Sequence, residues 1–283
     1  MDRTIKRIIS LILFAWVTLC MPFAAMAAES NQTAKYLIRN IPNPTCNSIG
    51  GEWAIVGLSR CSYPVPEEYF EKYYKNLERV VKECNGILSE DSYTEYSRVI
   101  IALSSIEKDG KNVAGYDLSK PLKDYKKVIE QGLNGAIYAL LALDAGGYSG
   151  PKIQLRDYII QKELTSGGWS FWEKGSADPD MTAMAVQALS RYRYDKKTKS
   201  AIDRAMPILK MKSFESCETV SQVILALDSI GIKPNEGLIK QLKQFQCSNG
   251  GFKHSLEDEE SNLMSTEQAL MAISVLEKWY IRD

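Results

Sequence analysis

An apolar segment that ends in Ala-Leu, or in a close variant of it, recurs along the chain of 283 residues. Five of these segments place alanines at positions 102, 142, 188, 226 and 272, which are 40, 46, 38 and 46 residues apart. A sixth segment precedes them by a similar interval. The six are Gly51–Leu58, Tyr93–Leu103, Asn134–Leu143, Thr182–Leu189, Thr219–Leu227 and Thr266–Ile273. A period of this length is typical of repeat architectures, in which each unit buries its apolar face against its neighbours.

A second kind of segment alternates with the first. Its apolar residues recur at intervals of three and four, which indicates amphipathic helices, and alternation at intervals of two is almost absent. Five such segments stand between the apolar ones: Pro66–Lys82, Leu122–Ile129, Ile153–Leu164, Thr198–Leu209 and Glu236–Phe245. The sequence therefore predicts an all-α protein.

The alternation also predicts how the helices are layered. A helix that is apolar nearly all round is buried on most sides, whereas a half-polar helix lies at the surface. Six inner helices jacketed by about five outer helices satisfy both patterns, which describes an α/α toroid. We expect the inner helices to be roughly parallel, with the loops Gly167-Gly168-Trp169 and Gly250-Gly251-Phe252 at one end. The alternative is an open solenoid of helix pairs.

The first 27 residues carry the features of a signal peptide. A basic start with Arg3, Lys6 and Arg7 precedes an apolar run, and Ala25-Met26-Ala27 fits a signal peptidase site. We expect cleavage there and a secreted or cell-surface protein with no transmembrane domain afterwards. An uncleaved anchor is the alternative, because about 20 apolar residues can span a bilayer.

The remaining chain divides into an N-terminal linker, residues 28–44, and one helical domain, residues 45–283. Segments of the second kind supply only five outer helices for six inner ones, so one outer position stays open. Either Ala28–Pro44 or the C-terminal residues could cover this seam.

Charge and cysteine content exclude several classes of protein. The chain has 35 basic and 35 acidic side chains, and the first 27 residues hold three of the former and one of the latter. Such a balance excludes the basic footprint of a nucleic-acid-binding protein. Five cysteines follow the leader, and an exported protein can form disulfides. We favour one bridge, Cys46–Cys61; the other pairings stay open.

The repeats resemble those of the terpene cyclase and protein prenyltransferase superfamily, and most closely those of secreted bacterial prenyltransferase-like and squalene-cyclase-like repeat proteins. The resemblance extends over nearly all of the chain after residue 27. It implies an α/α toroid but not one activity, since one fold carries many functions. The matching stretches are Gly50–Ala54, Tyr93–Ile100, Gln131–Gly135, Gly167–Trp169 with Asp178–Leu189, Thr219–Ile224 and Ser265–Gln268.

One stretch resembles a catalytic motif of the superfamily. Class II terpene cyclases carry Asp-x-Asp-Asp-Thr-Ala, whose middle aspartate protonates an alkene or an epoxide. Asp178, Asp180 and Thr182 fit this motif, but Met181 replaces the last aspartate. The resemblance implies that Asp180, with Asp178, could act as a general acid on an isoprenoid. Such an acid must be held protonated by burial or by a neighbouring carboxylate.

The start of a helix explains the same residues. Asp178 suits the N-cap, and Pro179 suits the first helical position, where its missing N–H costs nothing. Asp180 then lies in the first turn, where the helix dipole favours a negative charge and lowers the pKa of the carboxyl group. We therefore expect a capped helix rather than an acid catalyst, and lean against an enzyme.

No metal and no cofactor are expected. The superfamily's prenyltransferases bind zinc through an aspartate, a cysteine and a histidine. The resemblance aligns Asp180 with the cysteine and Ser265 with the histidine, so two ligands are missing. His254 is the only histidine, and we expect it in a surface loop or at the rim of a pocket.

Every inner helix is predicted to begin with polar or aromatic residues. If the inner helices are parallel, their free N–H groups and these side chains meet at one mouth of the ring. The candidate ligand-binding residues are Trp53, Tyr93, Glu95, Tyr96, Asn134, Trp169, Asp178, Asp180, Glu218, Thr266 and Glu267.

Three functions remain open. The first is a non-catalytic toroid that binds an unknown small molecule or surface partner at this mouth. The second is an enzyme that acts on an isoprenoid with Asp180 as acid. The third is a glycan-active α/α barrel.

Overall fold

The computed structural model describes residues 27–172 and 175–282, except for the side chains of residues 280–282. The described residues form twelve α-helices and contain no β-strand, only isolated bridges. The prediction of an all-α protein is thus confirmed. The predicted signal peptide, apart from residue 27, lies outside the described residues. No helix in the described part of the chain has the length and apolar character needed to span a bilayer.

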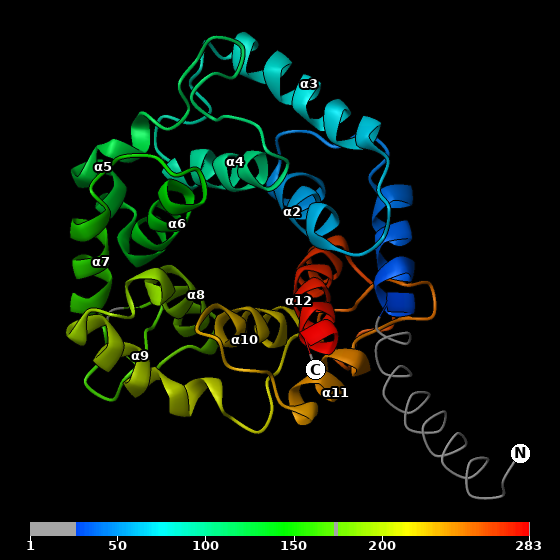
Figure 1. Cartoon of the computed structure of the whole chain (residues 1–283), viewed down its shortest axis with the longest axis vertical. Coiled ribbons are helices and arrows are strands. Elements are labelled where there is room, and N and C mark those ends of the chain that lie inside the picture. The colour runs from blue at the N-terminus through cyan, green and yellow to red at the C-terminus, as the bar shows by residue number, and fades with distance from the viewer. Residues whose placement is uncertain (1–26, 173–174, 283) are drawn as a thin grey trace, which may run out of the picture.

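Six helices surround a common centre (Figure 1). Each packs against the next, and the last packs against the first, so the order of contacts is closed. They correspond to the six predicted apolar segments. They are α2 (Trp53–Arg60), α4 (Tyr93–Ser105), α6 (Gly132–Ala145), α8 (Pro179–Leu189), α10 (Cys217–Ser229) and α12 (Leu263–Arg282).

The amphipathic helices lie outside this ring (Figure 1). They are α3 (Glu67–Glu83), α5 (Tyr125–Glu130), α7 (Lys152–Gln161), α9 (Lys196–Leu209) and α11 (Glu236–Gln244). Helix α3 shows why they stay outside, because it buries only Tyr69, Tyr73, Leu77 and Val81, one residue in each turn. Three short elements complete the chain: η1 (Ser48–Glu52), η2 (Pro121–Lys123) and η3 (Ser190–Tyr192).

The predicted linker 28–44 is wrong over most of its length, because residues 27–40 form a helix. This helix lies outside the ring between α3 and α11 (Figure 1). Ala34 and Leu37 are fully buried. The Nζ atom of Lys243 lies 3.0 Å from Oε2 of Glu29, which links the helix to α11. The segment thus takes the place of a sixth outer helix.

Two inner helices begin with the same hydrogen-bonded loop. The backbone N–H of Trp169 donates to Oγ1 of Thr182 at 3.0 Å, and that of Phe252 donates to Oγ1 of Thr266 at 2.8 Å. Both aromatic side chains are fully buried. Gly168 has φ +75°, and a Cβ atom there would lie 2.9 Å from Oγ1 of Thr182. The glycine is therefore needed for this close approach.

The predicted disulfide Cys46–Cys61 is not formed, since both cysteines are free. Cys46 precedes α2 and Cys61 follows it. Eight helical residues extend over about 12 Å, whereas the Cα atoms of a disulfide lie within about 7 Å of each other. Cys61 instead directs its Sγ atom to the carbonyl oxygen of Leu58 at 3.3 Å.

The repeated threonine bond predicts a matched pair of stability losses. Thr182→Val and Thr266→Val each leave a buried backbone N–H without its acceptor, which costs about 1–3 kcal/mol. Urea unfolding should show both losses. Thr94→Val is the control, because the Thr94 hydroxyl contacts only the Ser92 hydroxyl at a half-buried site. Equal stability of all three variants and the wild type would contradict the role of the repeated bond.

Candidate functional site

A cavity of about 150 Å³ lies on the axis of the ring, and each of the six inner helices contributes to its wall. We call it the axial cavity. Most of its wall is apolar or aromatic, and it includes the rings of Trp53 and Tyr138, which pack against each other with centroids 5.9 Å apart. Its lining residues are Trp53, Val56, Arg60, Ile101, Tyr138, Leu141, Ala145, Met184, Gln187, Gln222, Leu225 and Met271.

A wider space of about 280 Å³ adjoins the axial cavity at the last turns of the inner helices. We call it the C-terminal basin. The two spaces share Arg60, Leu141, Ala145, Gln187 and Leu225. Because the ends of α2, α6, α8, α10 and α12 all line this basin, these helices run in the same direction.

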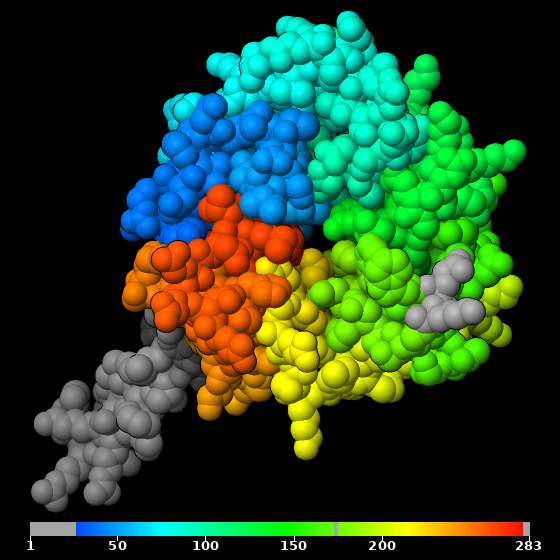
Figure 2. Space-filling view, turned by 180° about the vertical axis from the view of Figure 1, so that it is seen from behind, coloured from blue at the N-terminus to red at the C-terminus, as the bar shows by residue number. Residues whose placement is uncertain are grey.

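The other end of the ring carries charged side chains from the first turns of the inner helices. We call this set the N-terminal layer. It consists of Glu52, Glu95, Arg98, Asp180, Glu218 and Glu267. Figure 2 shows this face, on which the loop before α12 (orange) lies beside a narrow recess near the centre.

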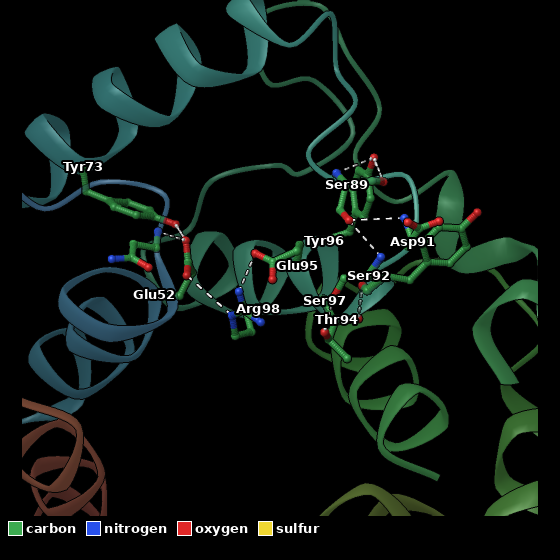
Figure 3. A network of polar contacts seen from close by, with 12 residues as sticks. Glu52, Tyr73, Ser89, Asp91, Ser92, Thr94, Glu95, Tyr96, Ser97 and Arg98 are labelled. Atoms are coloured by element: carbon green, nitrogen blue, oxygen red, sulfur yellow. Dashed lines mark hydrogen bonds and ion pairs between the residues drawn. The ribbon is translucent and has the colours of Figure 1, made fainter. Parts of the chain in front are cut away.

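Arg98 lies between two carboxylates of the layer (Figure 3). Its Nη2 atom lies 2.5 Å from Oε2 of Glu95, and its Nε atom lies 3.7 Å from Oε2 of Glu52. The second distance permits an ion pair but is too long for a hydrogen bond. The arginine thus compensates two of the five carboxyl groups.

Glu52 anchors the segment before α2. Its Oε1 atom accepts the backbone N–H of Asn47 at 3.1 Å and the Tyr73 hydroxyl at 3.4 Å. The side chain is buried, and this burial raises the pKa of the Glu52 carboxyl group to about 7 despite the nearby charge of Arg98. The Cys46 thiol lies against the same carboxyl group, and burial holds the thiol pKa far above its usual range.

Glu267, on α12, also anchors the segment before α2. Its Oε1 atom accepts the backbone N–H of Gly50 at 2.8 Å, although the side chain is fully buried. Burial, and to a lesser extent the charge of Glu52, raises the pKa of the Glu267 carboxyl group to about 8. Both carboxyl groups therefore titrate near neutral pH.

Asp178 caps a helix, whereas Asp180 is a carboxyl group with a raised pKa. The prediction that Asp178 caps the helix that begins at Pro179 is confirmed, because its Oδ1 atom accepts the backbone N–H of Met181 at 2.8 Å. The expectation that the helix dipole lowers the pKa of Asp180 is wrong. Burial raises that pKa, and it outweighs the hydrogen bond from the Thr219 hydroxyl.

The N-terminal layer holds most of the buried side-chain atoms that lack a hydrogen-bond partner. Seven such atoms occur in the described part of the chain, and four belong to this layer. They are Oε2 of Glu52, Nε of Arg98, Oδ1 of Asp180 and Oε2 of Glu267. Since buried polar groups are almost always bonded, a concentration of this kind at one place calls for an explanation.

The other predicted residues serve the fold more than a pocket. Trp169 donates its indole N–H to the carbonyl of Ile159 at 2.7 Å, and Tyr96 donates its hydroxyl to the carbonyl of Ser89, away from the axis (Figure 3). Tyr93 packs edge-on against Tyr96, and Asn134 lies half-buried in the first turn of α6. Of the predicted binding residues, only Trp53 lines the axial cavity.

The rim of the mouth contains a second polar group of contacts. Glu218 accepts the Ser265 hydroxyl at 2.6 Å and lies 2.8 Å from Nδ1 of His254. His254 is exposed, as expected for a residue in a surface loop. No group of three or more His, Cys, Asp or Glu side chains in residues 27–172 and 175–282 is arranged to hold a metal ion.

Sequence reasoning placed Glu52 with Trp53 among the polar inner-helix starts, but it missed Arg98, Tyr138 and Arg60 as site residues. Arg98 could have been found, because it stands in the first half of an otherwise apolar helix that is buried on most sides. A charge in such a helix needs a partner. Tyr138 and Arg60 carry no such signal in the sequence. Whether their side chains face the axis depends on how the six inner helices pack together.

Comparison with known proteins gives the chain no relatives. No protein-family model matches it, and no curated protein matches its sequence. The geometry of the site is therefore the only ground for a proposal about function.

The two buried glutamates predict that stability falls with rising pH. Their folded-state pKa values, about 7 and about 8, exceed the ordinary value of 4.5. Between those limits the folded state binds more protons than the unfolded state, so each carboxyl group lowers the free energy of unfolding by up to about 1.4 kcal/mol per pH unit. Urea unfolding between pH 4.5 and 8 measures this slope.

Glu267→Gln should flatten the slope, because the amide oxygen can still accept the N–H of Gly50. Glu68→Gln is the matched control, since Glu68 is exposed on α3. A wild-type protein whose stability rises over this pH range, or a Glu267→Gln variant with an unchanged slope, contradicts the assignment.

Proposed function

We propose that this chain is an exported, non-catalytic α/α toroid of the terpene cyclase and protein prenyltransferase type. The closed order of contacts from α2 through α12 supports the toroid, as do the six outer helices, including residues 27–40. The repeated Thr182 and Thr266 bonds support descent from a repeated unit. Export rests on the predicted signal peptide, residues 1–27.

We further propose that its function is to bind a small polar molecule at the mouth formed by the inner-helix N-termini. The observation that carries this proposal is the group of four buried atoms without a hydrogen bond in the N-terminal layer. Two of them, Nε of Arg98 and Oε2 of Glu52, share only the 3.7 Å ion pair, whereas Oδ1 of Asp180 and Oε2 of Glu267 have no partner of either kind. Leaving such atoms unpaired costs about 1–3 kcal/mol each. A ligand that hydrogen-bonds to them recovers that cost, so they are poised for binding.

The chemistry of the layer limits the ligand. Three of the four atoms are carboxyl oxygens, and the fourth is a guanidinium N–H. Because Glu52 and Glu267 titrate near neutral pH, they can present acceptors or donors. A ligand with several hydroxyl or amine groups fits this surface. Its binding should change with pH across the range in which these two groups titrate.

Binding at the mouth is tested by a thermal-shift screen of polar metabolites on the protein without residues 1–27, followed by calorimetry of the hits. We expect Asp180→Asn and Glu267→Gln to weaken a hit at least tenfold, which corresponds to about 1.4 kcal/mol. Asp203→Asn is the matched control, because Asp203 lies exposed on α9. Hits that bind both mouth variants as tightly as the wild type would refute the proposed site.

One observation favours the alternative enzyme. Asp180 is a carboxyl group whose pKa is raised by burial, as an acid catalyst requires, and Tyr138 lies close enough to interact with its charge. The size of the axial cavity, which Asp180 does not line, argues against a polyene substrate. The axial cavity has about 150 Å³, and a cavity of this volume holds a molecule about the size of benzene.

We therefore predict no turnover of squalene, oxidosqualene or geranylgeranyl diphosphate. The measurement is product analysis after incubation of these substrates with wild type and with Asp180→Asn. A cyclised product that wild type forms and the variant does not would establish the enzyme and overturn the non-catalytic proposal.

A further inference from the structure

The opposite end of the axis presents an arginine without a counter-ion. Arg60 is the last residue of α2 and lines both the axial cavity and the C-terminal basin. The residue is exposed to solvent at the opening of these spaces, and the protein atoms around its guanidinium group lower the pKa of that group by desolvation. No carboxylate contributes to that shift in the opposite direction. A guanidinium group in this setting favours an anion.

The carboxylates of the basin are already engaged. Asp144 lies 2.9 Å from Nζ of Lys152 and accepts the Tyr192 hydroxyl at 3.2 Å. Asp228 accepts the indole N–H of Trp279 at 3.0 Å. Two further cations, Arg191 and Lys278, line the same basin and are exposed. The indole N–H leaves the charge of Asp228 in place, so three cations of the basin face one carboxylate without an ion pair, and positive charge prevails at this opening.

Beyond Arg60, the wall is mostly apolar, and its two glutamines, Gln187 and Gln222, are hydrogen-bonded to each other at 2.8 Å. Trp53, Ile101, Tyr138, Met184 and Met271 lie deeper along the axis. The cavity volume of about 150 Å³ equals that of a protein cavity that binds benzene. An anionic group beside Arg60 can thus be joined directly to an apolar group of that size.

We propose that the axial cavity binds a small organic carboxylate whose benzene-sized apolar group lies between Trp53 and Met184 and whose carboxylate pairs with Arg60. A planar guanidinium group binds a planar carboxylate through two parallel hydrogen bonds. The C-terminal ends of five inner helices surround the basin. Their partial negative charge disfavours a dianion more strongly than a monoanion. A monovalent carboxylate fits better than a phosphate.

This inference is independent of the polar mouth. Arg60 ends α2, whereas Glu52 immediately precedes it, so about 12 Å of helix separates the two ends. Removing the carboxyl groups of the mouth leaves Arg60 and the apolar wall in place. The two proposals can therefore fail separately.

The test uses calorimetry with 3-phenylpropionate on the protein without residues 1–27. Its neutral and cationic analogues, 3-phenylpropan-1-ol and 3-phenylpropylamine, and inorganic phosphate are titrated in parallel. We expect the carboxylate to bind at least tenfold more tightly than each of the other three. Equal binding of the alcohol or tighter binding of phosphate would overturn the assigned chemistry, and absence of carboxylate binding at millimolar concentration would overturn the site.

Two variants place the ligand. Arg60→Gln should weaken carboxylate binding at least tenfold while leaving binding of the alcohol unchanged, whereas Arg79→Gln, on the exposed face of α3, should change neither. Ala145→Leu narrows the passage between basin and cavity and should weaken both ligands. Circular dichroism and thermal unfolding verify that each variant is folded. Undiminished carboxylate binding by Arg60→Gln or Ala145→Leu would refute the placement.

Discussion

The contact between the last inner helix and the first closes the ring, and the axial cavity and the crowded first turns of the inner helices depend on it. Helix α12 packs on α2, and a Cβ atom at Gly57 would lie 3.3 Å from the side chain of Leu270. Gly57 faces this contact, and the small residues Ala54 of α2 and Ala269 of α12 are fully buried. Burial of apolar area in these contacts supplies the main stabilising free energy. Even a methyl group at Gly57 would require Leu270 to shift by a few tenths of an ångström, and a larger side chain would press further on this contact.

Closure of the ring of inner helices limits the space on its axis. Six helices that approach this closely leave an axial cavity of about 150 Å³, which is small for the polyene substrates of terpene cyclases. It also brings the first turns of the inner helices together. Carboxyl groups that a helix N-terminus normally tolerates well become buried beside one another there. The raised pKa values of Glu52, Asp180 and Glu267 follow from this crowding, because desolvation is their largest cause.

The sequence predicts the helices better than it predicts the site. All six inner and five outer segments could be predicted because apolar spacing is a local property, and so could the cap at Asp178. Residues 27–40 were missed as a helix, since their apolar residues are few and adjoin the leader. The pKa shift of Asp180 was predicted with the wrong sign because burial depends on the neighbouring helix α10. The position of Arg60 at the basin depends on the four other inner helices that line it, α6, α8, α10 and α12.

The two ends of the axis are electrostatically distinct, and helix α2 connects them. Glu52 stands before its first residue, with a carboxyl group that is largely protonated below pH 7, and Arg60 is its last residue. A protonated layer does not repel an anion in the cavity, whereas an ionised layer does. At about 12 Å the interaction is weak in water but appreciable through a protein interior, where the effective dielectric constant is lower. An anion beside Arg60 should therefore favour the protonated form of the layer, so occupancy of the cavity and the charge of the mouth are thermodynamically linked.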